Sequence, residues 1–236
     1  MRRQVFSVLA PAAVALLLGG CCSDSTAPHD RLPPLENRGV AAQSGYLAAA
    51  MVDVAPVSLL YHDGKNKDKG LGDGFGLAAG AGDGDYIFSF APGDPVQGTV
   101  YLHFRQGGAE GTPCSFETAD WARAWTAAGR PLIVDLVPGG VSWLLGLELL
   151  SDIDRAAGAA TVSGGGILVV GDYTADWSVA GLAVVDSGNW PSEGGLTLTN
   201  EGITAVVTYN GDHTATVEVE GETYIVDLNT GQLNGI

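Results

Sequence analysis

Beyond residue 85, hydrophobic and polar side chains alternate along several short segments, as they do in β-strands that bury one face. In the segment 99–105, one face is apolar and consists of Val100, Leu102 and Phe104. The opposite face is polar and aromatic, and it consists of Tyr101, His103 and Arg105. Residues 86–90 precede this segment across a turn that contains Pro92-Gly93-Asp94-Pro95. The two segments are therefore predicted to form a β-hairpin with a long loop.

Further apolar or alternating segments follow, with clusters of Gly, Pro and Asp between them; they are residues 132–137, 141–150, 159–170 and 179–185. Many short strands with turn residues at this spacing are typical of antiparallel all-β domains. We therefore predict an all-β fold, an antiparallel β-sandwich or a barrel-like domain.

The C-terminal segments also predict their own pairing. Glu220-Gly221 forms a two-residue hairpin turn, which places Val217 opposite Tyr224 and Ala215 opposite Val226. The preceding turn has to contain an odd number of residues, because a shift by one residue would turn every side chain to the other face. We predict a three-residue loop through Asp212, with Gly211 in or near left-handed geometry. The pairs expected from that loop are Ala205 with Val217 and Ile203 with Val219.

The other face of these C-terminal strands is polar and is predicted to face water; it carries Thr204, Thr208, Thr214, Thr216, Glu218 and Thr223.

Two segments allow a helix. Residues 45–61 are rich in Ala and Val, and up to Pro56 they fit a helix and a strand equally well. Near 118–128, Trp121 and Trp125 stand four residues apart and Thr118 can cap a helix N-terminus, so one short helix is predicted there.

The N-terminus has the three parts of a secretory signal. Arg2 and Arg3 form a basic start, residues 5–18 are mostly apolar, and the small residues Gly19 and Gly20 follow. A membrane-spanning helix is the alternative, but it needs about 20 apolar residues, and Pro11 interrupts this run. We therefore predict a signal peptide over residues 1–20.

The motif Leu18-Gly19-Gly20-Cys21 resembles the lipobox of bacterial lipoproteins. The resemblance covers only the first 21 residues, and it implies that Cys21 is the lipidation site and that acyl chains hold the protein on a membrane. Cys22 and Ser23 follow, where many lipoproteins of the inner membrane carry Asp. The expected location is the bacterial cell envelope, on the outer membrane, facing the periplasm or the cell surface.

Pro-rich and Ser-rich residues follow the lipobox and predict a disordered linker over residues 21–44. The rest of the chain, residues 45–236, is predicted to form a single β-rich domain.

The chain is strongly acidic. It has 11 Lys and Arg against 27 Asp and Glu, a formal charge of −16. Without Arg2 and Arg3 of the signal peptide the balance is 9 against 27, or −18. Such a surface repels nucleic acid and anionic lipid headgroups. Cations, neutral glycans and basic envelope proteins remain as partners.

The Gly-rich segment 63–85 is a candidate calcium site, because Ca²⁺ prefers carboxylate and amide oxygens on tightly turning loops. The candidate ligands are Asp63, Asn66, Asp68, Asp73, Asp83 and Asp85. The segment does not have EF-hand spacing, and three lysines within it oppose cation binding. The alternative is a loop without a ligand.

Three tryptophans follow an acid or an amide, in Asp120-Trp121, Asp176-Trp177 and Asn189-Trp190. An indole ring can stack on a sugar while its neighbour forms a hydrogen bond. Asn189 and Trp190 lie in an expected loop and are the candidate ligand-binding pair. The alternative is that the tryptophans fill the core.

No motif assigns a catalytic residue, since the chain has neither Gly-x-Ser-x-Gly nor Ser-x-x-Lys nor His-Glu-x-x-His. The function predicted from the sequence is a lipid-anchored, extracytoplasmic β domain that acts as a binding or envelope-structural module. A hydrolase that uses carboxylates or bound calcium is the alternative.

Overall fold

The computed structural model describes residues 36–59, 76–91, 93–136, 142–185 and 190–234. The predicted signal peptide and the predicted lipidation site Cys21 lie outside these residues. One α-helix, one short 3₁₀ helix and fourteen strands are present in the described part of the chain. They are α1 (Asn37–Val54), η1 (Ala55–Ser58), β1 (Gly76–Ala79), β2 (Asp85–Phe90), β3 (Val96–Gln106), β4 (Thr112–Pro113), β5 (Trp121–Trp125), β6 (Leu132–Val134), β7 (Trp143–Asp154), β8 (Ala159–Val170), β9 (Tyr173–Val185), β10 (Glu193–Asn200), β11 (Ile203–Tyr209), β12 (Thr214–Val219), β13 (Glu222–Asp227) and β14 (Gln232–Asn234).

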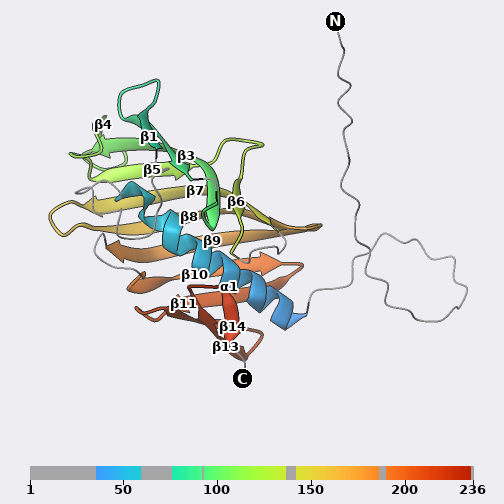
Figure 1. Cartoon of the computed structure of the whole chain (residues 1–236). Helices are drawn as coiled ribbons and strands as arrows, with labels where there is room; N and C mark the ends of the chain where they lie inside the picture. The colour runs from blue at the N-terminus through green and yellow to red at the C-terminus, as the bar shows by residue number, and fades with distance from the viewer. Residues whose placement is uncertain (1–35, 60–75, 92, 137–141, 186–189, 235–236) are drawn as a thin grey trace, which may run out of the picture. The chain divides into compact units, whose positions relative to one another are not determined.

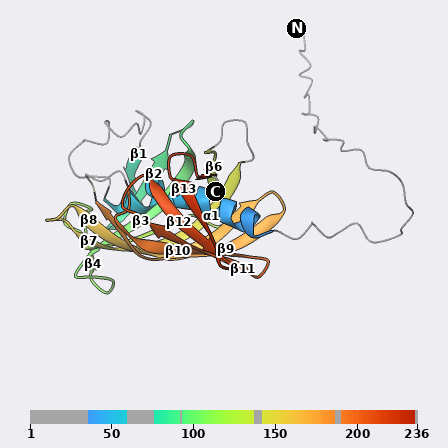
Figure 2. The same cartoon turned by 90° about the horizontal axis from the view of Figure 1, so that it is seen from below.

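The predicted antiparallel all-β fold is confirmed. The strands follow the order β1-β2-β3-β5-β7-β8-β9-β10-β11-β12-β13-β14, with β4 beside β3 and with β6 between β3 and β7. All the pairings among the described strands are antiparallel. The sheet curves around α1, which crosses its concave face (Figures 1 and 2). We call that face the inner face and the opposite one the outer face.

The core lies between α1 and the inner face. Every second residue of the long strands is buried there, as in β7, where Leu145, Leu147 and Leu149 alternate with more exposed neighbours. The helix is buried on most of its circumference, and small residues such as Ala48 and Ala50 let it lie close to the strands. By length and composition, residues 37–58 could also cross a membrane, but 72% of the apolar 18-residue window within them is buried in this core.

The linker prediction is wrong for residues 37–44, which form the first turns of α1. Polar Gln43 and Ser44 make this stretch resemble a linker, yet both side chains are buried. Each has a partner, because Asn200 Nδ2 donates to Gln43 Oε1 at 2.7 Å and Ser44 donates to the Ala41 carbonyl at 2.8 Å. Buried polar groups are tolerated when they are paired in this way.

The short helix predicted near 118–128 is also wrong, because Trp121–Trp125 is strand β5. A spacing of four residues fits one face of a helix, but it equally fits one face of a strand. Here Ala122 and Ala124 are buried on the inner face, and Trp121, Arg123 and Trp125 lie on the other side.

The hairpin of β2 and β3 is confirmed, with Phe88 opposite Val100. In the C-terminal hairpin, β12 and β13 pair as predicted, with Val217 opposite Tyr224 and Ala215 opposite Val226.

The predicted register of β11 and β12 is wrong by two residues. Ala205 pairs with Val219 instead of Val217, so the three-residue loop is 211–213. Asp212 selects these residues, because its carboxylate accepts hydrogen bonds from the backbone and the hydroxyl of Thr214. A shift by two keeps each side chain on its predicted face, and Gly211 has the predicted positive φ of 79°.

Candidate binding site on the outer face

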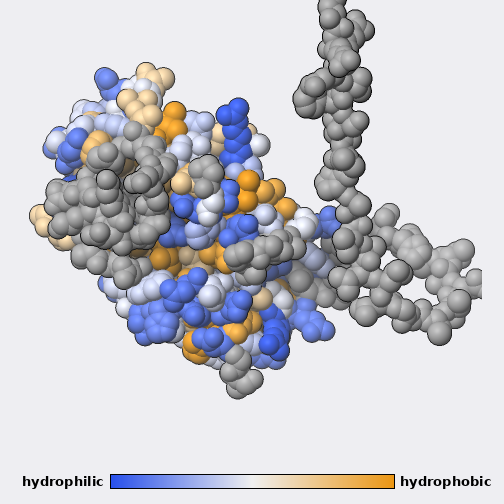
Figure 3. All heavy atoms as spheres, viewed as in Figure 1, coloured by the Kyte–Doolittle hydropathy of each residue, from blue (hydrophilic) through white to orange (hydrophobic). Residues whose placement is uncertain are grey.

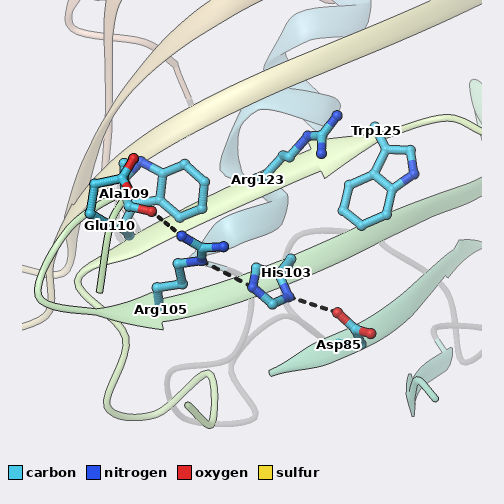
Figure 4. A pocket seen from close by; sticks show the side chains of 8 residues that line it. Asp85, His103, Arg105, Ala109, Glu110, Arg123 and Trp125 are labelled. Atoms are coloured by element: carbon cyan, nitrogen blue, oxygen red, sulfur yellow. Dashed lines mark hydrogen bonds and ion pairs between the residues drawn. The ribbon is translucent and has the colours of Figure 1, made fainter. Parts of the chain in front are cut away.

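A pocket of about 490 Å³ opens on the outer face, over β2, β3 and β5 (Figure 4). Its lining comes from these strands and from the loop after β3, and it consists of Asp85, His103, Arg105, Ala109, Glu110, Trp121, Arg123 and Trp125. Figure 3, in the view of Figure 1, shows the side of the domain that α1 crosses, where polar residues lie around smaller apolar areas; the pocket lies on the opposite face.

Strand register brings these side chains together. Asp85 pairs with His103 across β2 and β3, and His103 pairs with Arg123 across β3 and β5. One pair further along, Arg105 lies opposite Trp121. On the other side of this row, Trp125 lies opposite Tyr101, and the two rings stack with their centroids 5.9 Å apart. At its β5 end, this row of polar side chains therefore has Trp121 on one side of Arg123 and Trp125 on the other.

The polar side chains form a continuous chain of hydrogen bonds (Figure 4). His103 Nδ1 lies 2.7 Å from a carboxylate oxygen of Asp85, and Arg105 Nε donates to His103 Nε2 at 3.1 Å. Arg105 Nη1 in turn donates to the carbonyl of Ala109. Because arginine only donates, His103 Nε2 must accept, and this pattern fits the neutral imidazole with its proton on Nδ1.

Both arginines lie over tryptophan rings. The guanidinium carbon of Arg105 is 5.7 Å from the ring centroid of Trp121, and that of Arg123 is 5.0 Å from the centroid of Trp125. Contacts of this kind are attractive and fix the plane of the guanidinium. Arg123 also forms an ion pair with Glu148 of β7, at 2.9 Å.

The carboxylate of Asp120 holds the loop that closes one end of the pocket. It accepts hydrogen bonds from the backbone N–H groups of Gly107 and Gly108 at 2.9–3.0 Å. These bonds, from Gly108 first and then from Gly107, lower the pKa of Asp120. The loop that carries Ala109 and Glu110 is therefore anchored to the residue that precedes β5.

The arrangement favours binding over proton transfer. A histidine that acts as a general base needs an unoccupied ring nitrogen within reach of the substrate. In His103 both ring nitrogens have protein partners, Asp85 on one side and Arg105 on the other. The histidine therefore positions Arg105, and the pocket offers hydrogen-bond donors and acceptors between aromatic rings.

Two of the calcium candidates lie in the described part of the chain. Asp83 is exposed in the turn before β2, and Asp85 lies in the pocket with its carboxylate on His103. Asp63, Asn66, Asp68 and Asp73 lie outside the described residues. No group of three or more His, Cys, Asp or Glu side chains that could hold a metal occurs in the described ranges. Calcium binding thus stays a prediction for the segment 63–85.

The tryptophans have different environments. Trp177 is buried in the core and Trp190 packs partly buried against it, whereas Trp121 lies at the pocket. Asn189, the other half of the predicted ligand-binding pair, lies outside the described residues. Sequence reasoning missed the combination of His103, Arg105, Arg123 and Trp125. The available signal is the polar and aromatic alternation in β3 and β5, although in β5 the spacing of Trp121 and Trp125 also fits a helix.

Comparison of the chain with protein-family models, with curated proteins and with solved structures finds no match. Inferences about function therefore rest on the residues and geometry described above.

Proposed function

We propose that this chain is a lipid-anchored binding module of the bacterial cell envelope, and that the pocket over β2, β3 and β5 binds a glycan. The observation that carries the proposal is the row of Asp85, His103 and Arg123, in which Trp121 and Trp125 flank Arg123 on β5.

This combination suits the chemistry of sugars. A pyranose ring has C–H faces that pack on aromatic rings and hydroxyl groups that both donate and accept hydrogen bonds. Arg105 and Arg123 supply donors, while Asp85 and Glu110 supply acceptors. The positive and negative side chains balance within the pocket, which suits a ligand of low charge. Ligand sites of this kind combine apolar walls with a few convergent polar groups.

The anchor is supported by the sequence. The basic and apolar start, the lipobox and Cys21 predict export followed by lipidation. An acidic domain gains nothing from approaching anionic lipid headgroups. We therefore expect the acyl chains on Cys21 to supply the membrane contact, on the outer membrane, while the domain reaches its ligand in the periplasm or at the cell surface.

Glycan binding is tested with the full chain in detergent solution, applied to an array of defined oligosaccharides and then titrated with the best ligand by calorimetry. We expect saturable binding and an unchanged oligosaccharide after prolonged incubation. Saturable binding with cleavage would support the hydrolase alternative instead. An array without any bound glycan contradicts the proposed ligand class.

Anchoring is tested separately by replacing Cys21 with Ser and separating membranes from soluble material. We expect the wild-type protein in the membrane fraction and the variant outside it. A Cys21→Ser protein that still sediments with membranes contradicts lipidation at this residue.

A further inference from the structure

We infer that the glycan carries a carboxylate, as a uronic acid residue does, and that Arg105 binds this carboxylate. The inference rests on the proposed glycan-binding function and narrows it to one class of sugar.

The first argument is the set of partners around Arg105. Its Nε donates to His103 and its Nη1 to the carbonyl of Ala109, and both acceptors are neutral. Among the described residues, Arg105 has no carboxylate within ion-pair distance, although the chain has 27 acidic residues. Arg123, on the neighbouring strand, is paired with Glu148. Of the two arginines in this pocket, Arg105 is thus the one whose positive charge can form an ion pair with a ligand.

The second argument is that Arg105 is held in position. His103, Ala109 and the ring of Trp121 contact three sides of the guanidinium. Among the described residues, the remaining nitrogen, Nη2, has no hydrogen-bond acceptor. Carboxylates match the planar array of donors of a guanidinium well. A guanidinium that is already oriented also loses less conformational entropy when it binds.

Arg155 shows that carbonyl partners alone do not make a site. Its guanidinium donates to the carbonyls of Ala119 and Ser58. These two hydrogen bonds join η1 to the segment before β5. Arg155 is also partly buried, and this burial lowers its pKa. Arg105 differs because it lines an open pocket beside two aromatic rings.

The acids of the pocket leave room for a ligand carboxylate. Asp85 and Glu110 lie toward opposite ends, with His103 and Arg105 between them (Figure 4). Asp85 already contacts His103 at 2.7 Å, which offsets part of its repulsion toward an incoming anion. The ligand carboxylate therefore fits between the two acids, next to Arg105, and its sugar ring reaches the tryptophans.

The net charge of the chain limits how acidic the glycan can be. A surface with a formal charge of −16 repels a dense polyanion over about 8–10 Å at physiological salt. A single uronic acid residue among neutral sugars avoids most of this repulsion. A polymer of uronic acids alone should bind less well at low salt.

The test compares a trisaccharide that has one glucuronic acid between two N-acetylglucosamine residues with the same compound after reduction of its carboxylate to an alcohol. The full chain, in detergent at constant salt, is titrated with each by calorimetry. We expect the acidic form to bind at least about tenfold more tightly, since hydrogen bonds to charged groups are stronger than those between neutral groups. In Arg105→Gln this preference should disappear, and in Arg105→Lys a part of it should remain.

Arg130→Gln is the matched control, because it removes the same charge from the exposed turn after β5 and should keep the preference. Thermal unfolding by circular dichroism shows whether each variant is folded, and Arg105→Lys serves if Arg105→Gln is not. Equal binding of both trisaccharides overturns the inference but leaves glycan binding intact. A full preference in folded Arg105→Gln, or an undiminished one in folded Arg105→Lys, also overturns it. Binding of neither compound, together with an empty array, overturns the proposed function itself.

Discussion

The outer face of the sheet has two regions with the same architecture and different chemistry. Over β3 and β5 it carries large aromatic and charged side chains: Tyr101, His103, Arg105, Trp121, Arg123 and Trp125. Over β11 and β12 it carries short polar and aliphatic ones: Thr204, Val206, Thr208, Thr214, Thr216 and Glu218. The inner faces are alike, since Leu102 and Val207 are equally buried. The core requires only every second residue, which leaves the outer residues available for function.

The loops differ in the same way. The loop after β3 is tied to β5 through Asp120 and brings Ala109 and Glu110 to the pocket. The loop between β11 and β12 is tied to itself through Asp212 and Thr214. A pocket therefore forms where a loop is fastened across the outer face, and a loop that satisfies its own hydrogen bonds adds no wall.

The largest loss of glycan affinity is expected when Trp125, one of the two tryptophans that line the pocket, is replaced. Trp125→Ala should weaken glycan binding about 30-fold, or about 2 kcal/mol, as is usual when a central tryptophan is lost. Thr208→Ala, at an exposed position on the other region, should leave the affinity unchanged. Calorimetric titration of both variants checks the contrast, and a similar loss in both would show that the two regions do not differ in function.

The next effect is on stability and concerns Asp53, at the end of α1. Burial, and then the negative charge of Asp94 in the loop between β2 and β3, raise the pKa of Asp53 to about 6. The folded state therefore binds a proton more tightly than the unfolded state. The contribution of this group is fully present below pH 3.8, its ordinary pKa, and is lost as the pH rises through about 6.

Asp53→Asn cannot ionise, so it should be more stable than the wild type at pH 7.5. A pKa raised from 3.8 to about 6 corresponds to about 3 kcal/mol, and solvent screening at the partly exposed Asp53 reduces the expected gain to roughly 1–2 kcal/mol. The stabilities of the two proteins should become equal as the pH falls toward 4. Urea unfolding of both proteins across this pH range measures the difference between their free energies of unfolding. The contributions of all other acids are the same in both proteins and cancel in this difference. A variant that is less stable at pH 7.5 would contradict the assignment.

A smaller change, a loss of stability, is expected for a substitution on the inner face of the C-terminal strands. Tyr209 is buried, and its hydroxyl donates to the carbonyl of Ala48 in α1 at 3.1 Å. Burial raises the pKa of Tyr209, so it stays protonated at neutral pH. Tyr209→Phe should cost about 1 kcal/mol of stability. Thr216→Ala on the outer face should change it by less than about 0.5 kcal/mol, and urea unfolding should separate the two variants.

The smallest effect is expected at the loop of the pocket. Asp120→Asn weakens the hydrogen bonds from Gly107 and Gly108, so it should lower the glycan affinity only about threefold, as loss of a modest hydrogen bond does. The amide protons of both glycines should exchange faster with solvent. Because these bonds lower the pKa of Asp120, the wild-type loop should stay protected until the pH falls below the usual range of an aspartate. Unchanged exchange in the variant would show that the loop does not depend on Asp120.

Much of the fold could be predicted from periodicity. The alternation in β3 identified Val100, Leu102 and Phe104 as buried, and all three are. Each side chain of β11 and β12 lies on its predicted face although the predicted register was wrong, because the register error is two residues and faces repeat every two residues. Residues 37–44 could not be recognised as a helix, since the partner of Gln43 is Asn200, far away in the sequence.

The pocket could not be predicted because it depends on which strands are neighbours. His103 and Arg123 face each other only because β5 pairs directly with β3. Between them in the sequence lie β4 and a turn, and nothing in the pattern shows that β4 lies aside from the main strand order. A pair such as Asp85 and His103, in contrast, could have been found from the hairpin of β2 and β3.

The position of α1 has a consequence for the synthesis of the protein. The helix comes first in the described chain, yet its hydrogen-bond partners Asn200 and Tyr209 come 157 and 161 residues later than Gln43 and Ala48. The core cannot close until nearly the whole chain is available, and such distant contacts slow folding. If the chain is exported, as we propose from the predicted signal peptide, it has to pass through a membrane channel before it folds, and slow folding is then an advantage. Folding before export would require strands near the C-terminus, and these are synthesised last.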